Sequence, residues 1–202
     1  MSIAGHIGAL QREAAWRVSR WVLAHRIRAR HPTLICDPTA IWDYGFRDIA
    51  AIEIGKSVSV LAHVEIVVRS RSPHSDKEGR LVLGDNSVIG AGANIRAAGG
   101  EIHLGKGSGI GQNTVVVAAN HAIKPGQMRI HTRWDETRCN VFIGDNVWIG
   151  ANSVILPGCR VGDNAVIGAG GVVSSDVPPN ELWAGVPARR VKAFEPDASL
   201  SR

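Results

Sequence analysis

The residue with the strongest potential for chemistry in this chain is a histidine at a break in a regular pattern. His121 lies in AANHAIKPG, where a six-residue repeat stops and an irregular insert over residues 119–141 begins. A neutral imidazole can accept a proton from a hydroxyl group near neutral pH, so His121 is a candidate general base. Judged by position alone, His121 is equally consistent with a loop histidine that makes only a structural hydrogen bond.

Further candidates lie in or near the same insert. His131 and Asp135 stand within it and are expected to border a substrate site, because loops of this length in compact domains are usually functional or disordered. Trp148 follows at an outward-facing position of the repeat, where an exposed indole is costly unless it is covered. The other histidines of the repeat region have no partner in the sequence and are expected to be structural or exposed: His63, His74 and His103.

An aliphatic period of six residues defines the elements that must position these side chains. In the cleanest stretch an aliphatic residue returns at every sixth position: Ile143, Ile149, Ile155, Val161, Ile167 and Val173. Helices and strands have periods of about 3.6 and 2 residues, so neither explains this spacing. A hexapeptide period is typical of a parallel β-helix, a solenoid with flat faces and sharp corners.

Other positions of the repeat also recur. Glycine often follows the aliphatic residue: Gly84, Gly90, Gly105, Gly111, Gly144, Gly150, Gly162 and Gly168. Asparagine often stands two residues further on: Asn86, Asn113, Asn146, Asn152 and Asn164. Both residue types tolerate positive φ, so both are predicted at tight corners. The position four after the aliphatic residue is predicted to share the interior: Val147, Ser153, Cys159 and Ala165.

The repeat has interruptions that suggest boundaries. A polar loop near residues 69–80, RSRSPHSDKEGR, separates early hexads from those that resume at Leu83. Residues 33–50 are predicted to be irregular, with three aromatic residues capping the first coil: Trp42, Tyr44 and Phe46. We therefore expect a helix within residues 1–32, a repeat domain over residues 33–192 and a short tail over residues 193–202.

The N-terminal segment holds the whole net charge. Residues 1–32 contain six arginines and one glutamate, which accounts for the net charge of +5, so the remaining chain is neutral and gives no general indication of nucleic-acid binding. Residues 8–30 contain no proline and place apolar residues on one side, which predicts an amphipathic helix that ends at His31-Pro32. Such a helix could contact an anionic membrane or pack on its own oligomer, and both interpretations stay open.

The composition of the chain indicates the cellular compartment in which we expect the protein. The chain is 45% hydrophobic and 20% charged, and no stretch approaches the roughly 20 apolar residues that span a bilayer. Cys36, Cys139 and Cys159 form no metal-like cluster, and sparse free thiols are typical of a reducing compartment. We therefore expect a cytoplasmic protein, with peripheral contact at the inner face of the membrane through residues 8–30 as one interpretation.

The later part of the chain resembles a known family. Residues 140–192 read NVFIGDNVWIGANSVILPGCRVGDNAVIGAGGVVSSDVPPNELWAGVPARRVK. An Asn-His pair that opens a loop, then IGDNVWIG, then AGVPARRV make the segment similar to the maltose, galactoside and polysaccharide O-acetyltransferases of the hexapeptide-repeat superfamily. The resemblance covers about residues 50–192. It implies an all-β fold, a left-handed parallel β-helix, although crossovers in general are right-handed.

The resemblance also implies partners and residue roles. Its members are homotrimers that use acetyl-CoA, need no metal and have active sites between subunits. His121 matches their catalytic histidine, and Trp148 lies beside their catalytic cleft. Asn94 stands near an asparagine that contacts the acceptor in galactoside acetyltransferases, with a corner asparagine as the equal alternative.

For coenzyme A, the resemblance implies a set of small and basic residues: Ala151, Ala169, Ser174, Ser175, Arg189 and Lys192. Many relatives have Thr-Lys where this chain has Ser174-Ser175, so one positive contact is missing. Arg189 and its neighbour Arg190 could replace it by meeting a nucleotide phosphate.

The combined hypothesis is acetyl transfer from acetyl-CoA to a hydroxyl group of a sugar or glycan, with His121 as general base. Acetylation of a sugar amine or of serine would use similar base chemistry and stays an alternative. A non-catalytic solenoid scaffold is a third possibility, because fold alone does not define function. A zinc carbonic anhydrase of the same fold would need two loop histidines five residues apart, and the residue five after His121 is Gly126.

Overall fold

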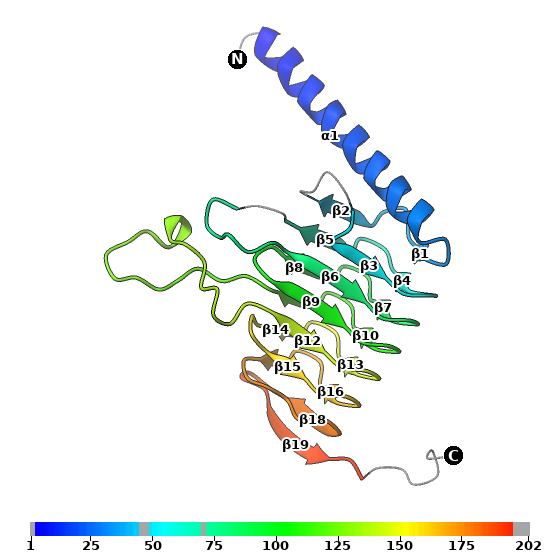
Figure 1. The fold of residues 1–202 in the computed structure, drawn as a ribbon, viewed down its shortest axis with the longest axis vertical. Helices are drawn as coiled ribbons and strands as arrows, with labels where there is room; N and C mark the ends of the chain where they lie inside the picture. The colour runs from blue at the N-terminus through cyan, green and yellow to red at the C-terminus, as the bar shows by residue number, and fades with distance from the viewer. Residues whose placement is uncertain (1–2, 45–48, 70–71, 196–202) are drawn as a thin grey trace.

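The computed structural model describes residues 3–44, 49–69 and 72–195 of the 202-residue chain as a solenoid with one helix at its N-terminal end (Figure 1). Helix α1 spans Ile3–Arg30, which begins earlier than the predicted residues 8–30 and ends where His31-Pro32 predicts. A short 3-10 helix spans Arg129–His131. The strands are β1 (Ile35–Cys36), β2 (Ile41–Tyr44), β3 (Ile52–Ile54), β4 (Ser59–Val60), β5 (Glu65–Val68), β6 (Arg80–Leu83), β7 (Val88–Ile89), β8 (Asn94–Ala97), β9 (Glu101–Leu104), β10 (Gly109–Ile110), β11 (Val115–Val117), β12 (Val141–Ile143), β13 (Trp148–Ile149), β14 (Val154–Ile155), β15 (Arg160–Val161), β16 (Val166–Ile167), β17 (Val172–Val173), β18 (Glu181–Ala184) and β19 (Arg189–Ala193).

The strands form three sheets, one for each face of the coil. In the described residues their orders are β1-β4-β7-β10-β13-β16-β18-β19, β2-β5-β8-β11-β14-β17 and β3-β6-β9-β12-β15. Up to β17, each strand therefore neighbours the strand three further along the chain. Strands of successive coils pair in parallel and in register, as Ile110 does with Ile89 and with Ile149. The chain is a left-handed parallel β-helix, as the resemblance implies.

The six-residue period corresponds to the buried core. Ile143, Ile149, Ile155 and Ile167 are each fully buried. Burial of one such side chain contributes about 1.5–3 kcal/mol before entropy is counted. The small residues predicted to share the interior are also buried: Val147, Ser153, Cys159 and Ala165.

The corners confirm one part of the prediction and correct another. All five predicted asparagines adopt positive φ, between 53° and 58°. The glycines that follow the aliphatic residues do not, so the positive-φ explanation is wrong for them. They are needed because successive coils approach closely: a Cβ on Gly105 would lie 2.3 Å from the carbonyl oxygen of Gly144.

The first coil begins earlier than the sequence pattern suggests. The prediction of an irregular segment over residues 33–50 is wrong, because β1 and β2 lie within it and their residues pair in register with β4 and β5. Trp42 is buried in the core, whereas Phe46 lies outside the described residues. The solenoid therefore begins two strands earlier at this end than the aliphatic hexads indicate.

Among the side chains that the structure describes, those in the last turns of helix α1 pack on the solenoid. Ile27 is fully buried, and Leu23 and Ala24 pack against the core, whereas the helix projects away from the first coil (Figure 1). Val18 and Trp21 are largely exposed. Within the described part of the chain, no helix is both long enough and apolar enough to span a membrane.

The opposite end of the solenoid is closed by β18 and β19, which pair antiparallel after the last coil. The predicted tail begins in β19, and its residues 196–202 lie outside the described residues.

Candidate active site

A cavity of about 490 Å³ opens where the two loops meet the face formed by β5, β8 and β11. Its lining is part polar and part apolar: Arg69, Ser72, Pro73, Arg96, Ala98, Val117, Ala119, Asn120, His121 and Trp134. The volume is in the range of sites that hold a small molecule. Among the predicted site residues in the described chain, only His121 lies in this lining.

Both ring nitrogens of His121 have a partner. Nδ1 lies 3.0 Å from the carbonyl oxygen of Thr132, and Nε2 lies 3.2 Å from Nε1 of Trp134. A carbonyl oxygen can only accept and an indole N–H can only donate, so the partners assign the proton to Nδ1 and a lone pair to Nε2. That tautomer leaves Nε2 as the basic nitrogen.

The insert positions Trp134 by folding back on itself. The N–H of Ala122 donates to the carbonyl of Arg133 at 2.9 Å, and the N–H of Asp135 donates to the carbonyl of Asn120 at 2.8 Å. These two bonds flank a bridge between His121 and Trp134. The indole ring consequently stands edge-on to the imidazole, with a centroid separation of 6.0 Å.

His74 joins the site from the earlier loop, a contact for which the sequence holds no signal. Its ring lies edge-on to His121 at 5.2 Å, and its carbonyl accepts a hydrogen bond from the N–H of Trp134 at 2.7 Å. The loop near residues 69–80, of which residues 70–71 lie outside the described residues, is therefore in direct contact with His121.

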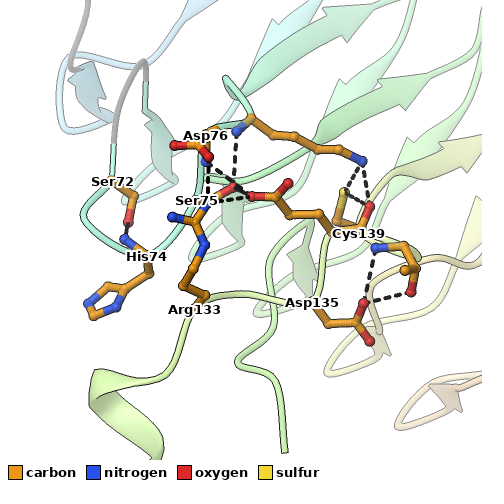
Figure 2. Close-up of polar contacts among 10 residues, drawn as sticks. Ser72, His74, Ser75, Asp76, Arg133, Asp135 and Cys139 are labelled. Carbon is orange, nitrogen blue, oxygen red and sulfur yellow. Dashed lines mark hydrogen bonds and ion pairs between the residues drawn. The ribbon is translucent and has the colours of Figure 1, made fainter.

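A cluster of polar side chains fastens the two loops together (Figure 2). We call Ser75, Asp76, Lys77, Arg133 and Glu136 the loop clamp. The hydroxyl of Ser75 donates to Glu136 Oε1 at 2.7 Å, the N–H of Asp76 donates to the same oxygen at 3.0 Å, and Arg133 pairs with Asp76 at 2.6 Å. Lys77 Nζ donates to the carbonyl of Glu136.

The loop clamp favours the ionised form of Glu136. The hydrogen bond from Ser75 is the largest cause that lowers the pKa of this carboxyl group, followed by the N–H of Asp76 and by the positive charges of Arg133 and Lys77. Ser75 and Glu136 are 61 residues apart in the chain, so the loop clamp forms only when the tertiary structure brings the two loops together.

His131 and Asp135 do not line the cavity. His131 is exposed at the end of the 3-10 helix. Asp135 Oδ1 accepts hydrogen bonds from the N–H of Thr137 at 3.0 Å and from its hydroxyl at 2.6 Å, which lower the pKa of the Asp135 carboxyl group. Its carboxylate therefore supports the local turn and does not reach His121.

Asn94 lies on strand β8, so the alternative of a corner asparagine is wrong. Its amide donates to Glu65 Oε2 at 2.7 Å. The cavity is instead reached by Arg96, two residues further along the same strand.

The residues expected to bind coenzyme A lie apart from the cavity. Ala151 and Ala169 occupy adjacent corners, since the N–H of Gly170 donates to the carbonyl of Ala151 at 2.8 Å. Ser174 and Ser175 are exposed after β17, and two basic residues lie on β19: Arg189 and Lys192.

Trp148 also lies on another face. It belongs to β13, in the eight-stranded sheet, whereas the cavity lies on the six-stranded sheet, and 58% of its surface is exposed. The indole ring of Trp148 lies against Gly109 of the neighbouring coil. A Cβ atom added to Gly109 would be only 3.0 Å from the ring carbons of Trp148. A single chain thus presents two separate sets of residues, one around His121 and one around Trp148 and the corners.

Comparison with known proteins identifies relatives of this chain. Residues 140–175 match the family model described as bacterial transferase hexapeptide (six repeats). The galactoside O-acetyltransferase of Escherichia coli K12 is 39% identical over 46% of this chain and 55% of its own length. The chain spans about half the length of the curated relatives it matches.

Solved structures extend the similarity. An N-acyltransferase from Bacillus cereus, AntD, superposes with a TM-score of 0.61 over 85% of this chain and 89% of its own, and its 20% identity shows a shared fold. A maltose O-acetyltransferase from Clostridium difficile 630 is 32% identical over 71% of this chain and 70% of its own, with a TM-score of 0.53. At this identity and coverage, the chain belongs to the hexapeptide-repeat O-acetyltransferase family.

Proposed function

We propose that this protein transfers an acetyl group from acetyl-CoA to a hydroxyl group of a sugar or glycan. The observation that carries the proposal is the hydrogen bonding of His121, which leaves the basic Nε2 at the wall of a cavity of about 490 Å³. The similar proteins from Escherichia coli and Clostridium difficile are named as galactoside and maltose O-acetyltransferases, which supports a sugar as the acceptor.

The bonding of His121 suggests how the reaction proceeds. The acceptor hydroxyl replaces the indole N–H of Trp134 as the donor to Nε2, and its oxygen attacks the thioester carbonyl as the proton passes to Nε2. The carbonyl of Thr132, which accepts from Nδ1–H, stabilises the resulting imidazolium. Backbone N–H groups would stabilise the oxyanion. The tetrahedral intermediate then expels the coenzyme A thiolate, which takes the proton from His121.

The coenzyme would occupy the corner residues. Ala151 and Ala169 present small side chains beside backbone groups, which suits a pantetheine arm lying along the solenoid. Arg189 and Lys192 supply positive charge for a phosphate group. AntD, which has the same fold, has been crystallised in complex with coenzyme A.

The separation of the two residue sets supports a homotrimer. If the corners and Trp148 of one subunit face the His121 cavity of the next, the thioester and the base meet between subunits, and the exposed indole is covered. Light scattering on the purified protein tests this assembly, and a stable monomer would contradict it.

Helix α1 and the cysteines bear on location. All three cysteines are free, which supports a cytoplasmic protein. The exposed Trp21 and the basic last turn, with Arg28 and Arg30, suit either an anionic membrane surface or packing within the trimer. Sedimentation with anionic liposomes separates the two. If the helix binds a membrane, the Trp21→Ser protein should sediment less than the wild type, and a wild-type protein that does not sediment with the liposomes would remove the membrane role.

Release of free thiol from acetyl-CoA with a panel of sugars, amino sugars and serine tests the function. His121→Ala is expected to lower the rate by about 10²–10⁴-fold, because it removes the base. His131→Ala, in the same insert but outside the cavity, is the matched control and should stay near the wild-type rate. A fully active His121→Ala variant would refute the mechanism, and a preference for amino sugars would change the product to an amide.

A further inference from the structure

We infer that the acceptor is an anionic sugar, whose carboxylate or phosphate group is bound by Arg96 while His121 takes the proton from one of its hydroxyl groups. The inference rests on the proposed function and adds the class of acceptor. It is carried by the position, the neighbours and the unbalanced charge of Arg96.

Arg96 projects from the outer face of the sheet into the cavity that His121 also lines. Its partners in register are Val67 on β5 and Val117 on β11, so the guanidinium group rises from an apolar row. Val67 also faces outward and lies outside the core cluster, yet only 1% of its surface is exposed. The strand face beside Arg96 is therefore covered at Val67, whereas Arg96 itself is exposed and can meet a ligand that enters the cavity.

The charges around the cavity are not balanced. The lining contains two arginines and no carboxylate among the described residues. Arg69 is already neutralised by Asp43, at 2.5 Å. The backbone of Arg96 pairs within the sheet, but its guanidinium group makes no hydrogen bond or ion pair with any described residue. One positive charge beside the base therefore lacks a counter-charge.

The neighbouring acids cannot supply that counter-charge. Glu65 lies one strand away and accepts the amide of Asn94. Asp43 lies in the same row as Arg96 but two strands distant, which is about 10 Å, and it is engaged by Arg69. The counter-charge for the Arg96 guanidinium would consequently come from a bound ligand.

A planar guanidinium group suits an anion with two oxygens. Arginine binds carboxylate and phosphate groups through two parallel N–H···O bonds, and such charge-assisted bonds are about twice as strong as neutral ones. Ser72 and Asn120 add polar groups for hydroxyls, and Pro73 and Ala98 add apolar surface. A neutral sugar would leave Arg96 uncompensated, whereas an anionic sugar would pair with it.

The first test compares acceptors that differ only at one carbon: methyl glucoside, methyl glucuronide and methyl glucoside 6-phosphate, together with the matching galactose series. The kcat/KM for thiol release is expected to be about tenfold to a hundredfold higher for an anionic member than for its neutral partner. The carboxylate and phosphate arms distinguish the two sources of the anion. A wild-type protein that prefers the neutral sugars would overturn the inference.

The second test removes the charge. Arg96→Gln is expected to abolish the preference for the anionic sugar, and Arg96→Lys, which keeps the charge without the planar fork, should retain part of it. Arg160→Gln is the matched control, because it removes an equal charge from an exposed position on β15 in another sheet. Equal loss of preference in Arg96→Gln and Arg160→Gln would contradict a specific site.

Binding without turnover separates this inference from the proposed function. NMR titration of His121→Ala with inorganic phosphate and with methyl glucuronide should show saturable binding that weakens about tenfold or more when Arg96→Gln is added. If these anions bind through Arg96 but no acceptor releases thiol, the anion site stands and the proposed function fails. If thiol is released but neither anion binds, or both bind equally well without Arg96, the inference fails and the proposed function stands.

Discussion

In the coils between Ile143 and Val173, strands pair in register with strands of neighbouring coils, whereas the contacts of the two loops around His121 are not repeated along the described part of the solenoid. The coils depend on repeated contacts, such as the amide of Asn146 donating to Asn164 at 2.8 Å and that of Asn164 donating to Asn180 at 3.0 Å. The loops depend on single, non-repeated contacts such as the loop clamp.

The difference separates stability from chemistry. Burial of apolar side chains and backbone pairing with the coils on both sides stabilise each coil. Its shape therefore depends on many similar contacts and on no single one. The orientation of His121 depends on a few polar bonds between segments far apart in the chain. We therefore expect changes in the coils to alter unfolding, and changes in the clamp to alter turnover.

The largest effect on stability should come from the core of the coils. Ile149→Ala removes a fully buried side chain between two coils and is expected to lower the free energy of unfolding by about 2–5 kcal/mol. Urea denaturation at fixed protein concentration measures it. The control is Ile123→Ala in the insert, where the side chain is 81% exposed. Similar losses in both variants would erase the distinction between coil and loop.

A change in the clamp should mainly reduce turnover. Glu136→Gln weakens the bonds from Ser75 and from the N–H of Asp76, so His74 and Trp134 lose their fixed position against His121. We expect kcat to fall by roughly tenfold to a hundredfold, as small misplacements of catalytic groups do, with little change in the urea midpoint. Asp135→Asn is the neighbouring control, because the Asp135 carboxylate bonds only to Thr137 among the described residues. A Glu136→Gln protein that unfolds as readily as Ile149→Ala would contradict the comparison.

A corner substitution should have a smaller effect. Asn164 has φ of 58°, so Asn164→Ala places a side chain in the left-handed region and removes two bonds of the asparagine row. The expected cost is about 1–2 kcal/mol of unfolding free energy. Asn164→Gly accepts the same φ and isolates the loss of the side-chain bonds. If both variants were as stable as the wild type, the corners would not contribute to the coil.

Acid should loosen the clamp gradually. The pKa of Glu136 is lowered from its ordinary value of 4.5 mainly by the hydroxyl of Ser75. A group whose folded pKa is depressed stabilises the fold above its unfolded pKa, and this contribution is lost as the pH falls through the folded pKa. The NMR signal of the Asp76 backbone N–H, which donates to Glu136 Oε1, should therefore shift on acidification, and the Glu136→Gln protein should lack this transition. The transition should also weaken with added salt, because the carboxylate is near solvent.

The parts of the fold that the sequence predicts are those set by local repetition. The aliphatic hexads and the corner asparagines follow from a period within a few residues, and both are confirmed. The first coil escapes prediction because its interior positions are Cys36 and Trp42, which pair with Val60 and Ile66 but are not aliphatic. Their six-residue separation is the signal that could have identified them.

The site is predictable only where it touches the repeat. His121 is identifiable because the hexads stop beside it, whereas Trp134 and His74 reach it through folds of loops that carry no period. Arg96 escapes prediction because an arginine at an outward strand position is indistinguishable in the sequence from any solvent-exposed charge. Its cavity exists only after the two loops have closed over the sheet.

The hydrogen bond from Trp134 to His121 also affects the state of the site before an acceptor binds. With the acceptor absent, the lone pair of His121 Nε2 is occupied by the indole N–H, so a water molecule in the cavity meets no free base. An acceptor must compete with Trp134 before any oxygen can be deprotonated, and a sugar held at a second point competes better than water. If the protein carries out the proposed transfer, it can thus hold a reactive thioester and resist its hydrolysis until an alcohol acceptor binds.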